Sequence, residues 1–200
     1  MRVAGVLLAA GAATRMGRNK VLVELEGESL LRRAARRAIE AGLDPVVVVL
    51  GHEATRAEAE LAGLRCTAVL NGEYARGMNT SLSAGVDALP AEATAAVVLL
   101  ADMPFVDAAA IRAVVARYQE SGAPVVTARY GEVTAPPTLY DRALFLELRG
   151  GQGEGRGREV VRRYRERAEL VEYPASTLMD VDEPDDVERA RARLAGERSK

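Results

Sequence analysis

Short runs of apolar residues alternate along the chain with longer stretches rich in Ala, Leu, Arg and Glu. Uninterrupted apolar runs are typical of strands in a parallel sheet that is covered on both faces. The stretches between them have helical composition, so the elements alternate between strand and helix. The pattern predicts an α/β fold with an open, mostly parallel sheet and helices on both faces. The predicted strands are 3–8, 46–50, 66–70, 96–100 and 125–128.

Several side chains mark where the predicted helices begin. Ser29 is a candidate N-cap for a helix that ends before Gly42, and Asp107 is a candidate for a later helix. Thr80 or Ser81 could open a helix between these two. Each predicted strand is therefore followed by a segment that can cross back over the sheet.

The regular alternation stops after the fifth predicted strand. Residues 129–160 contain Gly131, the pair Pro136 and Pro137, and the glycine-rich segment 150–157. Glycine and proline interrupt regular elements and concentrate in turns and loops. We therefore expect an elaboration on the substrate side of the sheet, with a mobile glycine-rich lid within it.

Composition limits the classes of protein that the chain can belong to. It has 200 residues, 48% of them apolar, which suits a single domain over 1–200. The formal charge is −2 with acids and bases interspersed, which argues against a surface for nucleic acid or anionic lipid. Cys66 is the only cysteine, so no internal disulfide can form, and no apolar stretch is long enough to span a bilayer. With only two residues before the first strand, no signal peptide is expected and the predicted location is the cytoplasm.

The first predicted strand runs directly into a loop of small and basic residues. Small side chains let a ligand approach the backbone, whose free N–H groups can then hold oxyanions. Arg15 and Lys20 add two positive charges in the same short window. A glycine-containing turn with solvated basic residues is the alternative, but the combination favours a phosphate-binding loop. The residues of this loop are Leu8, Ala9, Ala10, Gly11, Arg15 and Lys20.

Residues 8–20 also match a known pattern. They fit L-A-A-G-x-x-x-R-M-G-x-x-K at every specified position, and they complete neither G-x-x-x-x-G-K-[ST] nor G-x-G-x-x-G. The stretch resembles the signature loop of the MobA-like nucleotidyltransferases, and among them it is most similar to the molybdenum cofactor cytidylyltransferases. The resemblance implies a three-layer, Rossmann-like fold of the nucleotide-diphospho-sugar transferase type. It extends, with weaker motifs in the second half, to about Arg193.

Two acidic motifs carry the predicted metal chemistry. Asp102 directly follows the fourth predicted strand, at the edge where a parallel sheet opens to its ligand. A carboxylate there suits Mg²⁺, which takes few protein ligands beside waters and phosphate oxygens, whereas capping of the next turn is the alternative. Asp180 and Asp182 fall on one side of an extended segment. The resemblance implies that Asp102 and Asp182 bind Mg²⁺ with Asp180 in support. Asp185 and Asp186 instead suit the N-terminus of a helix, where negative charges interact favourably with the helix dipole.

A polar loop follows the third predicted strand. It reads N-G-E-Y-A-R-G-M-N-T-S-L over 71–82 and resembles the family's N-x-x-[YW]-x-x-G-M-x-x-S-L. Gly77 lets the chain turn close to a ligand, while Asn71, Thr80 and Ser81 offer donors and acceptors for a base edge or a ribose hydroxyl. Taken alone, the string is a loop before a capped helix. Beside the first motif it predicts nucleotide recognition by Asn71, Gly77 and Ser81.

Two later motifs depart from the family pattern. A-P-P-T-L at 135–139 stands where the cytidylyltransferases show G-H-P, and G-E-G-R-G-R at 153–158 stands where they show G-D-x-G-A-R. Arg156 and Arg158 could bind an anionic acceptor, and a solvated basic loop fits them equally well. These departures concern the identity of the acceptor more than the nucleotidyl chemistry.

The resemblance that these motifs carry implies an enzyme that moves a nucleoside monophosphate from an NTP to an acceptor phosphate, with pyrophosphate leaving. The resemblance implies CTP as donor, molybdopterin as acceptor and Mg²⁺ as cofactor, with Arg15, Lys20 and Asp102 in catalytic roles. It also implies a transient contact with a molybdoenzyme or its chaperone. The alternatives are GTP as donor, a sugar or alcohol phosphate as acceptor, or a non-catalytic module that binds a nucleotide and hands on a cofactor.

Overall fold

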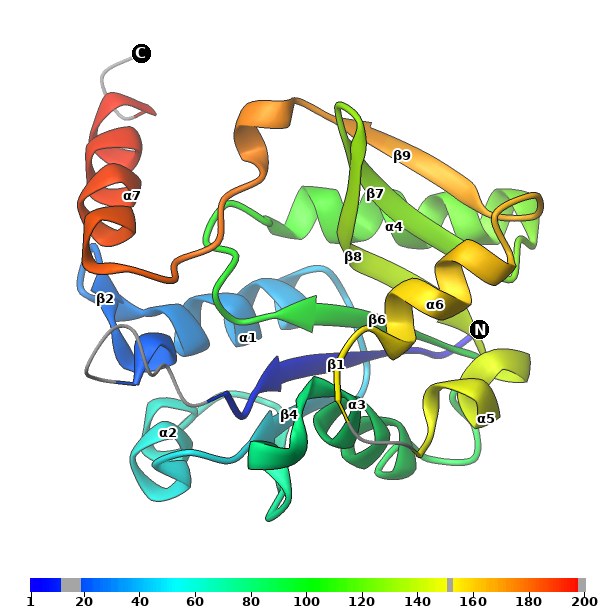
Figure 1. The fold of residues 1–200 in the computed structure, drawn as a ribbon, viewed down its shortest axis with the longest axis horizontal. Helices are drawn as coiled ribbons and strands as arrows, with labels where there is room; N and C mark the ends of the chain where they lie inside the picture. The colour runs from blue at the N-terminus through cyan, green and yellow to red at the C-terminus, as the bar shows by residue number, and fades with distance from the viewer. Residues whose placement is uncertain (12–18, 151–152, 198–200) are drawn as a thin grey trace.

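A seven-stranded sheet crosses the molecule in the computed structural model, which describes residues 1–11, 19–150 and 153–197 (Figure 1). Its strands are β1 (Val3–Ala9), β4 (Val46–Leu50), β5 (Thr67–Leu70), β6 (Ala95–Leu100), β7 (Val125–Tyr130), β8 (Val133–Asp141) and β9 (Glu169–Tyr173). They lie in the order β5-β4-β1-β6-β8-β7-β9, and every neighbouring pair is parallel except the two that involve β8. The predicted fold class, a mostly parallel open sheet, is confirmed.

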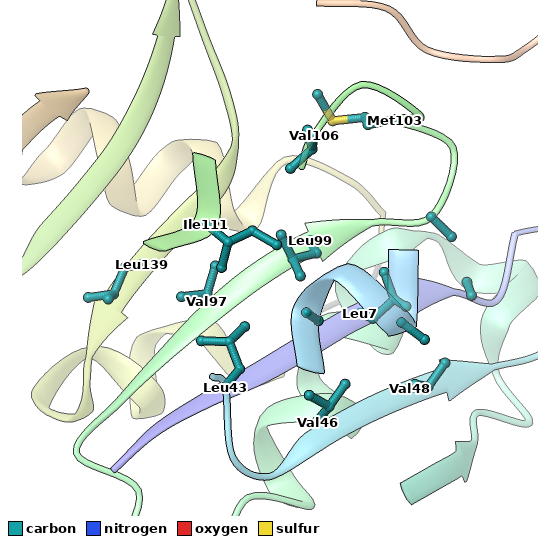
Figure 2. Close-up of a cluster of buried hydrophobic side chains, with 14 of the residues drawn as sticks. Leu7, Leu43, Val46, Val48, Val97, Leu99, Met103, Val106, Ile111 and Leu139 are labelled. Atoms are coloured by element: carbon teal, nitrogen blue, oxygen red, sulfur yellow. The ribbon is translucent and has the colours of Figure 1, made fainter. Parts of the chain in front are cut away.

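Helices cover both faces of this sheet. They are α1 (Leu30–Glu40), α2 (Ala54–Glu60), α3 (Met78–Asp87), α4 (Ala108–Ser121), α5 (Phe145–Leu148), α6 (Arg156–Arg163) and α7 (Pro184–Glu197). Alternate residues of β1 pack in opposite directions: Leu7 contributes to a core with α1, α2 and α4 (Figure 2), whereas Val6 and Leu8 pack with α3, α5 and α6. Among the described residues, no helix has the length and apolar character to cross a membrane.

Two predicted helix caps are confirmed and one is corrected. The Ser29 hydroxyl and the Asp107 carboxylate each accept a hydrogen bond from the backbone N–H three residues further on, at 3.2 and 2.7 Å. The helix expected to open at Thr80 or Ser81 begins earlier, at Met78. The reason lies in Gly77, whose φ of 109° ends the preceding turn and allows the helix to start directly after it.

One strand inside the sheet, β8, was not predicted from the sequence pattern. β7 turns at Gly131 and returns as β8, which runs antiparallel between β6 and β7. Pro136 and Pro137, joined by a cis peptide bond, lie within it although proline normally excludes an inner strand. The pairing with β7 jumps from Thr138 to Ala135, so both prolines fall in an irregularity where no regular pairing is required of them. The predicted elaboration over 129–160 therefore begins with a hairpin inside the sheet.

A small separate cluster ties the end of the chain to its beginning. The two-stranded hairpin of β2 (Glu24–Leu25) and β3 (Glu28–Ser29) packs against α7, and Figure 1 shows these elements side by side. The cluster consists of Val23, Leu25, Leu30, Phe105, Val181, Val187, Ala190 and Leu194. Because Val181 is fully buried in it, the cluster fixes the segment that carries Asp180 and Asp182.

Candidate active site

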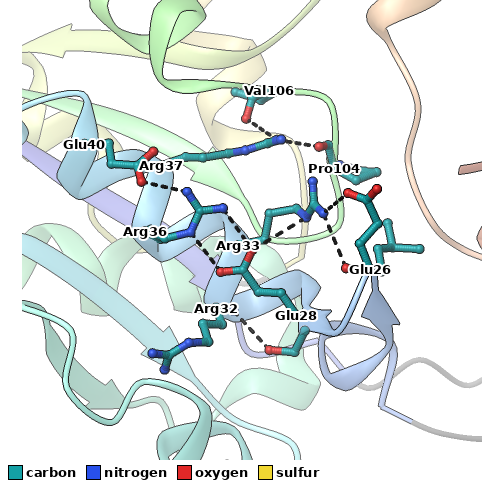
Figure 3. A network of polar contacts seen from close by, with 11 residues as sticks. Glu26, Glu28, Arg32, Arg33, Arg36, Arg37, Glu40, Pro104 and Val106 are labelled. Atoms are coloured by element: carbon teal, nitrogen blue, oxygen red, sulfur yellow. Dashed lines mark hydrogen bonds and ion pairs between the residues drawn. The ribbon is translucent and has the colours of Figure 1, made fainter. Parts of the chain in front are cut away.

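Asp102 lies just beyond the carboxyl end of β6, as predicted, on a loop that is anchored from two sides. Met103 and Val106 are buried in the core beside the sheet (Figure 2). From α1, Arg37 Nη1 donates to the carbonyl oxygens of Pro104 at 2.5 Å and Val106 at 3.0 Å (Figure 3). The carboxylate is therefore presented by a loop whose backbone and neighbouring side chains are both fixed.

Other arginines of α1 hold the hairpin that leads away from the first loop. The guanidinium of the buried Arg33 donates to the Leu25 carbonyl and pairs with Glu26, and that of Arg36 pairs with Glu28 in a two-bond arrangement (Figure 3). The hydrogen bonds from Arg36 lower the pKa of Glu28 despite its partial burial. This network fixes the hairpin on α1, and through the small cluster it also fixes α7.

Lys20 joins the two predicted acidic motifs. Its Nζ donates to Asp102 Oδ2 at 2.5 Å and to Asp182 Oδ1 at 2.6 Å. Burial opposes the charge of the ammonium, but the two carboxylates outweigh that effect and raise the pKa of Lys20. Residues 20, 102 and 182 thus meet in space as the motifs predict, through direct contact of their charged groups.

Asn19 sets the position of Lys20, and the sequence interpretation missed it. Its side chain is almost wholly buried, with Nδ2 donating to the carbonyl of His52 at 2.9 Å. Its Oδ1 caps the short 3₁₀ helix that begins at Lys20. An asparagine directly before the lysine was the available signal, because asparagine is a preferred N-cap residue.

Two backbone contacts place Asp182 opposite Asp102. Val181 N donates to the carbonyl of Asp102 at 2.9 Å, which joins the two segments directly. Asp186 Oδ2 accepts from the backbone N–H groups of Asp182 at 2.9 Å and Glu183 at 2.8 Å, and these bonds lower the pKa of Asp186. Asp186 does lie in the first turn of a helix, as expected, and it also positions the predicted metal ligand.

The end of β1 supplies backbone rather than side chains to the site. The side chains of Leu8, Ala9 and Ala10 are buried, so a nucleotide could meet these residues only through their main-chain atoms. Gly11 is exposed, and a Cβ added there would meet no described atom within 4 Å. Arg15 falls outside the described residues. The nucleotide contacts of this loop stay predictions.

Asn71 has a structural role that the motif alone did not reveal. Its Nδ2 donates to Thr80 Oγ1 at 2.9 Å and to Ser81 Oγ at 3.0 Å, and its Oδ1 accepts from Glu73 N at 2.9 Å. Asn71, Thr80 and Ser81 are all buried. The amide therefore ties the end of β5 to the first turn of α3, and the predicted nucleotide contacts of Asn71 and Ser81 stay predictions beside this role.

The described part of the glycine-rich segment 150–157 is hydrogen-bonded to the polar stretch 71–82, which is named here the nucleotide loop after its predicted role. The mobility expected of the glycine-rich segment stays a prediction. Gly153 N donates to the Arg76 carbonyl at 2.8 Å, and Asn79 N donates to the Gly153 carbonyl at 3.0 Å. Asn79 Oδ1 accepts from Arg156 N at 2.9 Å and so caps α6 from a different helix. At Gly77, an added Cβ would overlap the Gly153 carbonyl. The two loops are therefore packed backbone against backbone.

The two predicted acceptor residues lie at the start of α6. Arg158 is exposed, whereas Arg156 is partly buried. Arg156 Nε is buried without a hydrogen-bond partner among the residues that the structure describes. Their role in binding an acceptor stays a prediction, but the contact between Asn79 and Arg156 connects them to the nucleotide loop.

Residues 5–168 match the MobA-like NTP transferase domain. The chain belongs to the MobA-like NTP transferase family. As a member, it is a nucleotidyltransferase, which agrees with a lysine and two aspartates gathered at the carboxyl edge of a parallel sheet.

Two of three similar proteins span nearly the whole of this MobA-like chain, and the third matches about half of it. The purine catabolism protein PucB of Bacillus subtilis is 30% identical over 203 residues, which cover 96% of this chain and 97% of PucB. A probable molybdenum cofactor guanylyltransferase of Opitutus terrae is 35% identical over 108 residues, about half of either chain. The crystal structure of Rv0371c from Mycobacterium tuberculosis superposes with a TM-score of 0.83 at 27% identity, covering 96% of this chain and 98% of that one.

The acidic residues at this site fit a divalent cation that other ligands also coordinate. Asp102 Oδ1 is buried and has no hydrogen-bond partner in the described part of the chain. Loss of solvation and repulsion from Asp102 and Asp182 raise the pKa of Asp180 to about 6. Among residues 1–11, 19–150 and 153–197, no three His, Cys, Asp or Glu side chains are grouped to hold a metal on their own. Mg²⁺ bound by one or two carboxylates and completed by phosphate oxygens fits this arrangement.

Replacing Asp186 with alanine should loosen the Asp182 segment. Two backbone N–H groups would lose their acceptor, which we expect to lower the free energy of unfolding by about 1–2 kcal/mol. On the prediction that Asp182 binds Mg²⁺, the Mg²⁺ concentration that supports half-maximal turnover should rise by about tenfold, as for other residues that orient a metal ligand. Urea unfolding and Mg²⁺ titration of pyrophosphate release measure the two effects. Asp185→Ala, in the same turn but exposed, is the matched control, and equal effects of both variants would contradict the positioning role.

Proposed function

We propose that the protein transfers CMP from CTP to the terminal phosphate of molybdopterin and releases pyrophosphate, with Mg²⁺ as its cofactor. The observation that carries the proposal is the contact of Lys20 with both Asp102 and Asp182 at the carboxyl edge of the sheet. This arrangement offers a cation for phosphate oxygens and carboxylates for a metal ion at one point, which is what transfer of a nucleotidyl group requires.

The reaction needs orientation and charge neutralisation more than a strong base. An oxygen of the acceptor phosphate forms a bond to the α-phosphorus while the bond from that phosphorus to the pyrophosphate oxygen breaks. Because the attacking oxygen is already anionic, no proton has to be removed. Lys20 would contact phosphate oxygens near the reacting centre, and Arg15 would stabilise the leaving pyrophosphate. Asp102 and Asp182 would hold Mg²⁺, which when bound neutralises charge on the transferring phosphoryl group.

Two observations support the choice of substrates. The loop reads L-A-A-G, which resembles the cytidylyl-transferring members, whereas guanylyl-transferring members show L-A-G-G. PucB, similar over nearly its whole length, is named for purine catabolism. The family resemblance implies that the cytosine form of the molybdenum cofactor serves hydroxylases of the xanthine dehydrogenase type, and xanthine is itself a purine. On this proposal the product would pass to such an enzyme or to its chaperone.

The contact between the glycine-rich segment and the nucleotide loop supports the start of α6 as the part of the protein that binds the acceptor. Arg156 is the first residue of α6, and its backbone N–H donates to the side-chain oxygen of Asn79. Binding of an anionic acceptor at Arg156 or Arg158 would therefore affect the loop that is expected to bind the nucleotide. The second candidate is transfer of GMP from GTP, which the similarity to a probable guanylyltransferase favours.

Pyrophosphate release with each of the four NTPs tests this proposal. We expect turnover with Mg²⁺, CTP and molybdopterin to exceed that with GTP by at least about tenfold, as for a site that reads a base by hydrogen bonds. Preference for GTP would replace CTP by the second candidate. Turnover with a sugar or alcohol phosphate in place of molybdopterin would reassign the acceptor. Tight nucleotide binding without any pyrophosphate release would leave only a nucleotide-binding cofactor chaperone.

A further inference from the structure

Lys20 is an unusual cation in this chain. The sequence holds 27 lysines and arginines, and lysine occurs only at positions 20 and 200. Arginine presents a broad planar fork, whereas the ammonium of lysine is a compact charge on a flexible stem of four carbons. A compact charge can sit between two carboxylates and can also leave them without a change in the backbone.

The Lys20 ammonium stands between the carboxylates that are expected to hold the metal ion. Nζ lies 2.5 Å from Asp102 Oδ2 and 2.6 Å from Asp182 Oδ1, with the Lys20 and Asp102 side chains each less than a fifth exposed. The carboxylates of Asp102 and Asp182 are like charges that both contact this ammonium. Without Lys20, these like charges would repel one another with no cation between them.

The scaffold around this ion pair is fixed on both sides. Asn19 holds the start of the lysine's 3₁₀ helix, and Asp186 and the Val181 amide hold the aspartate segment. The backbone therefore keeps the carboxylates in place whether the ammonium is between them or not. Only the lysine side chain has to move to make room for another cation.

We propose that Lys20 is the resident counterion of the Asp102–Asp182 pair in the nucleotide-free protein, and that a divalent cation binds together with the nucleotide instead of before it. The inference rests on the proposed function in one respect, that a triphosphate is the anion to which Lys20 moves. As the lysine side chain turns to the phosphate oxygens, the two carboxylates become available to the cation. By linkage, the nucleotide must raise the affinity for the metal by the same factor by which the metal raises the affinity for the nucleotide.

Binding of Mn²⁺ to the nucleotide-free protein tests the counterion role. Electron paramagnetic resonance of free Mn²⁺ gives the affinity of the wild-type protein and of Lys20→Met, Lys20→Arg and the control Arg112→Met. Arg112 is exposed on α4, so its loss changes the net charge equally without touching the site. We expect Lys20→Met to bind Mn²⁺ about tenfold tighter or more than wild type, because a positive charge beside the metal ion is gone. Arg112→Met should bind as wild type does.

An Mn²⁺ affinity of Lys20→Met equal to that of wild type would overturn the proposal, as would an equal gain in Arg112→Met. Lys20→Arg should bind Mn²⁺ no tighter than wild type, since it keeps the charge. These measurements involve neither nucleotide nor acceptor. The Mn²⁺ affinities can be interpreted even if none of the NTPs yields pyrophosphate. Failure of the counterion role and failure of the proposed function therefore give different results.

The movement of Lys20 can be followed in the wild-type protein. Selective ¹³C labelling of lysine gives signals from two side chains, and Lys20→Met assigns one of them. We expect millimolar Mg²⁺ alone to leave the Lys20 signal in place, and Mg²⁺ with CTP or GTP to shift it. A full shift with Mg²⁺ alone would show that the metal displaces the lysine unaided and would overturn the proposed order. No shift with either nucleotide would contradict the movement of the lysine to phosphate.

Discussion

Replacing Asp102 with alanine should reduce pyrophosphate release by about a thousandfold while the protein stays folded. The carboxylate holds Lys20 with one oxygen, and its other oxygen is buried without a partner in the described structure, so both atoms serve the site. The loop itself is fixed independently by Met103, Val106 and the bonds from Arg37. A steady-state assay with saturating NTP and Mg²⁺ measures the loss, and thermal unfolding measures the stability.

Two further variants test whether the loss of activity comes from the negative charge at position 102. Asp102→Asn keeps the size of the side chain and removes its charge, so it should lose nearly as much activity as the alanine variant. Asp44→Ala removes a carboxylate that is exposed and paired with Arg2 in front of β4, and it should retain activity. If Asp102→Ala unfolded the protein, or if it retained a tenth of the turnover, the assignment of Asp102 as a metal ligand would be wrong.

Replacing Gly77 with alanine should separate the nucleotide loop from the glycine-rich segment. The backbone at Gly77 has φ of 109° and ψ of 166°, a region almost confined to glycine, and an added methyl group would overlap the Gly153 carbonyl. We expect the free energy of unfolding to fall by about 2–3 kcal/mol, and the KM for the acceptor to rise by about tenfold. Urea unfolding and initial rates at varied acceptor concentration measure these effects.

The same loop provides the control for this prediction. At Gly72 an added Cβ would meet no described atom within 4 Å, and its φ does not lie in the positive range. Gly72→Ala should therefore leave both stability and kinetics close to those of the wild type. A stable Gly77→Ala protein with an unchanged KM would show that the two segments need not be packed together for function.

Much of the fold was predictable because its strands are apolar without interruption. The burial of β1, β4 and β6 leaves no polar position in them, so the runs at 3–8, 46–50 and 96–100 were visible in the sequence. Asp102 could be placed for the same reason, since it directly follows one of them. β8 could not be predicted, because Pro136 and Pro137 normally exclude an inner strand and the irregular pairing that tolerates them depends on β7.

The residues that position the site were largely beyond reach of the sequence. Asn19, Asn79 and Asp186 act through bonds from a side chain to the backbone, and for Asn19 and Asn79 the partner lies 33 and 77 residues away. Nothing in a local pattern identifies such a partner. The Asn71 amide is the converse case: the motif marked the residue, but only the structure revealed that its bonds hold the start of α3.

The long separation in sequence between Asp182 and the other two charged residues has a consequence for biosynthesis. The ribosome makes Lys20 and Asp102 well before it makes Asp182, and Val181 is buried in one cluster with Leu25 of the β2–β3 hairpin and with residues of α7. A nascent protein that has already folded its central sheet still lacks the second carboxylate. If Asp182 serves as proposed, the site is therefore complete only after residue 182 has been made and its segment has packed onto the β2–β3 hairpin.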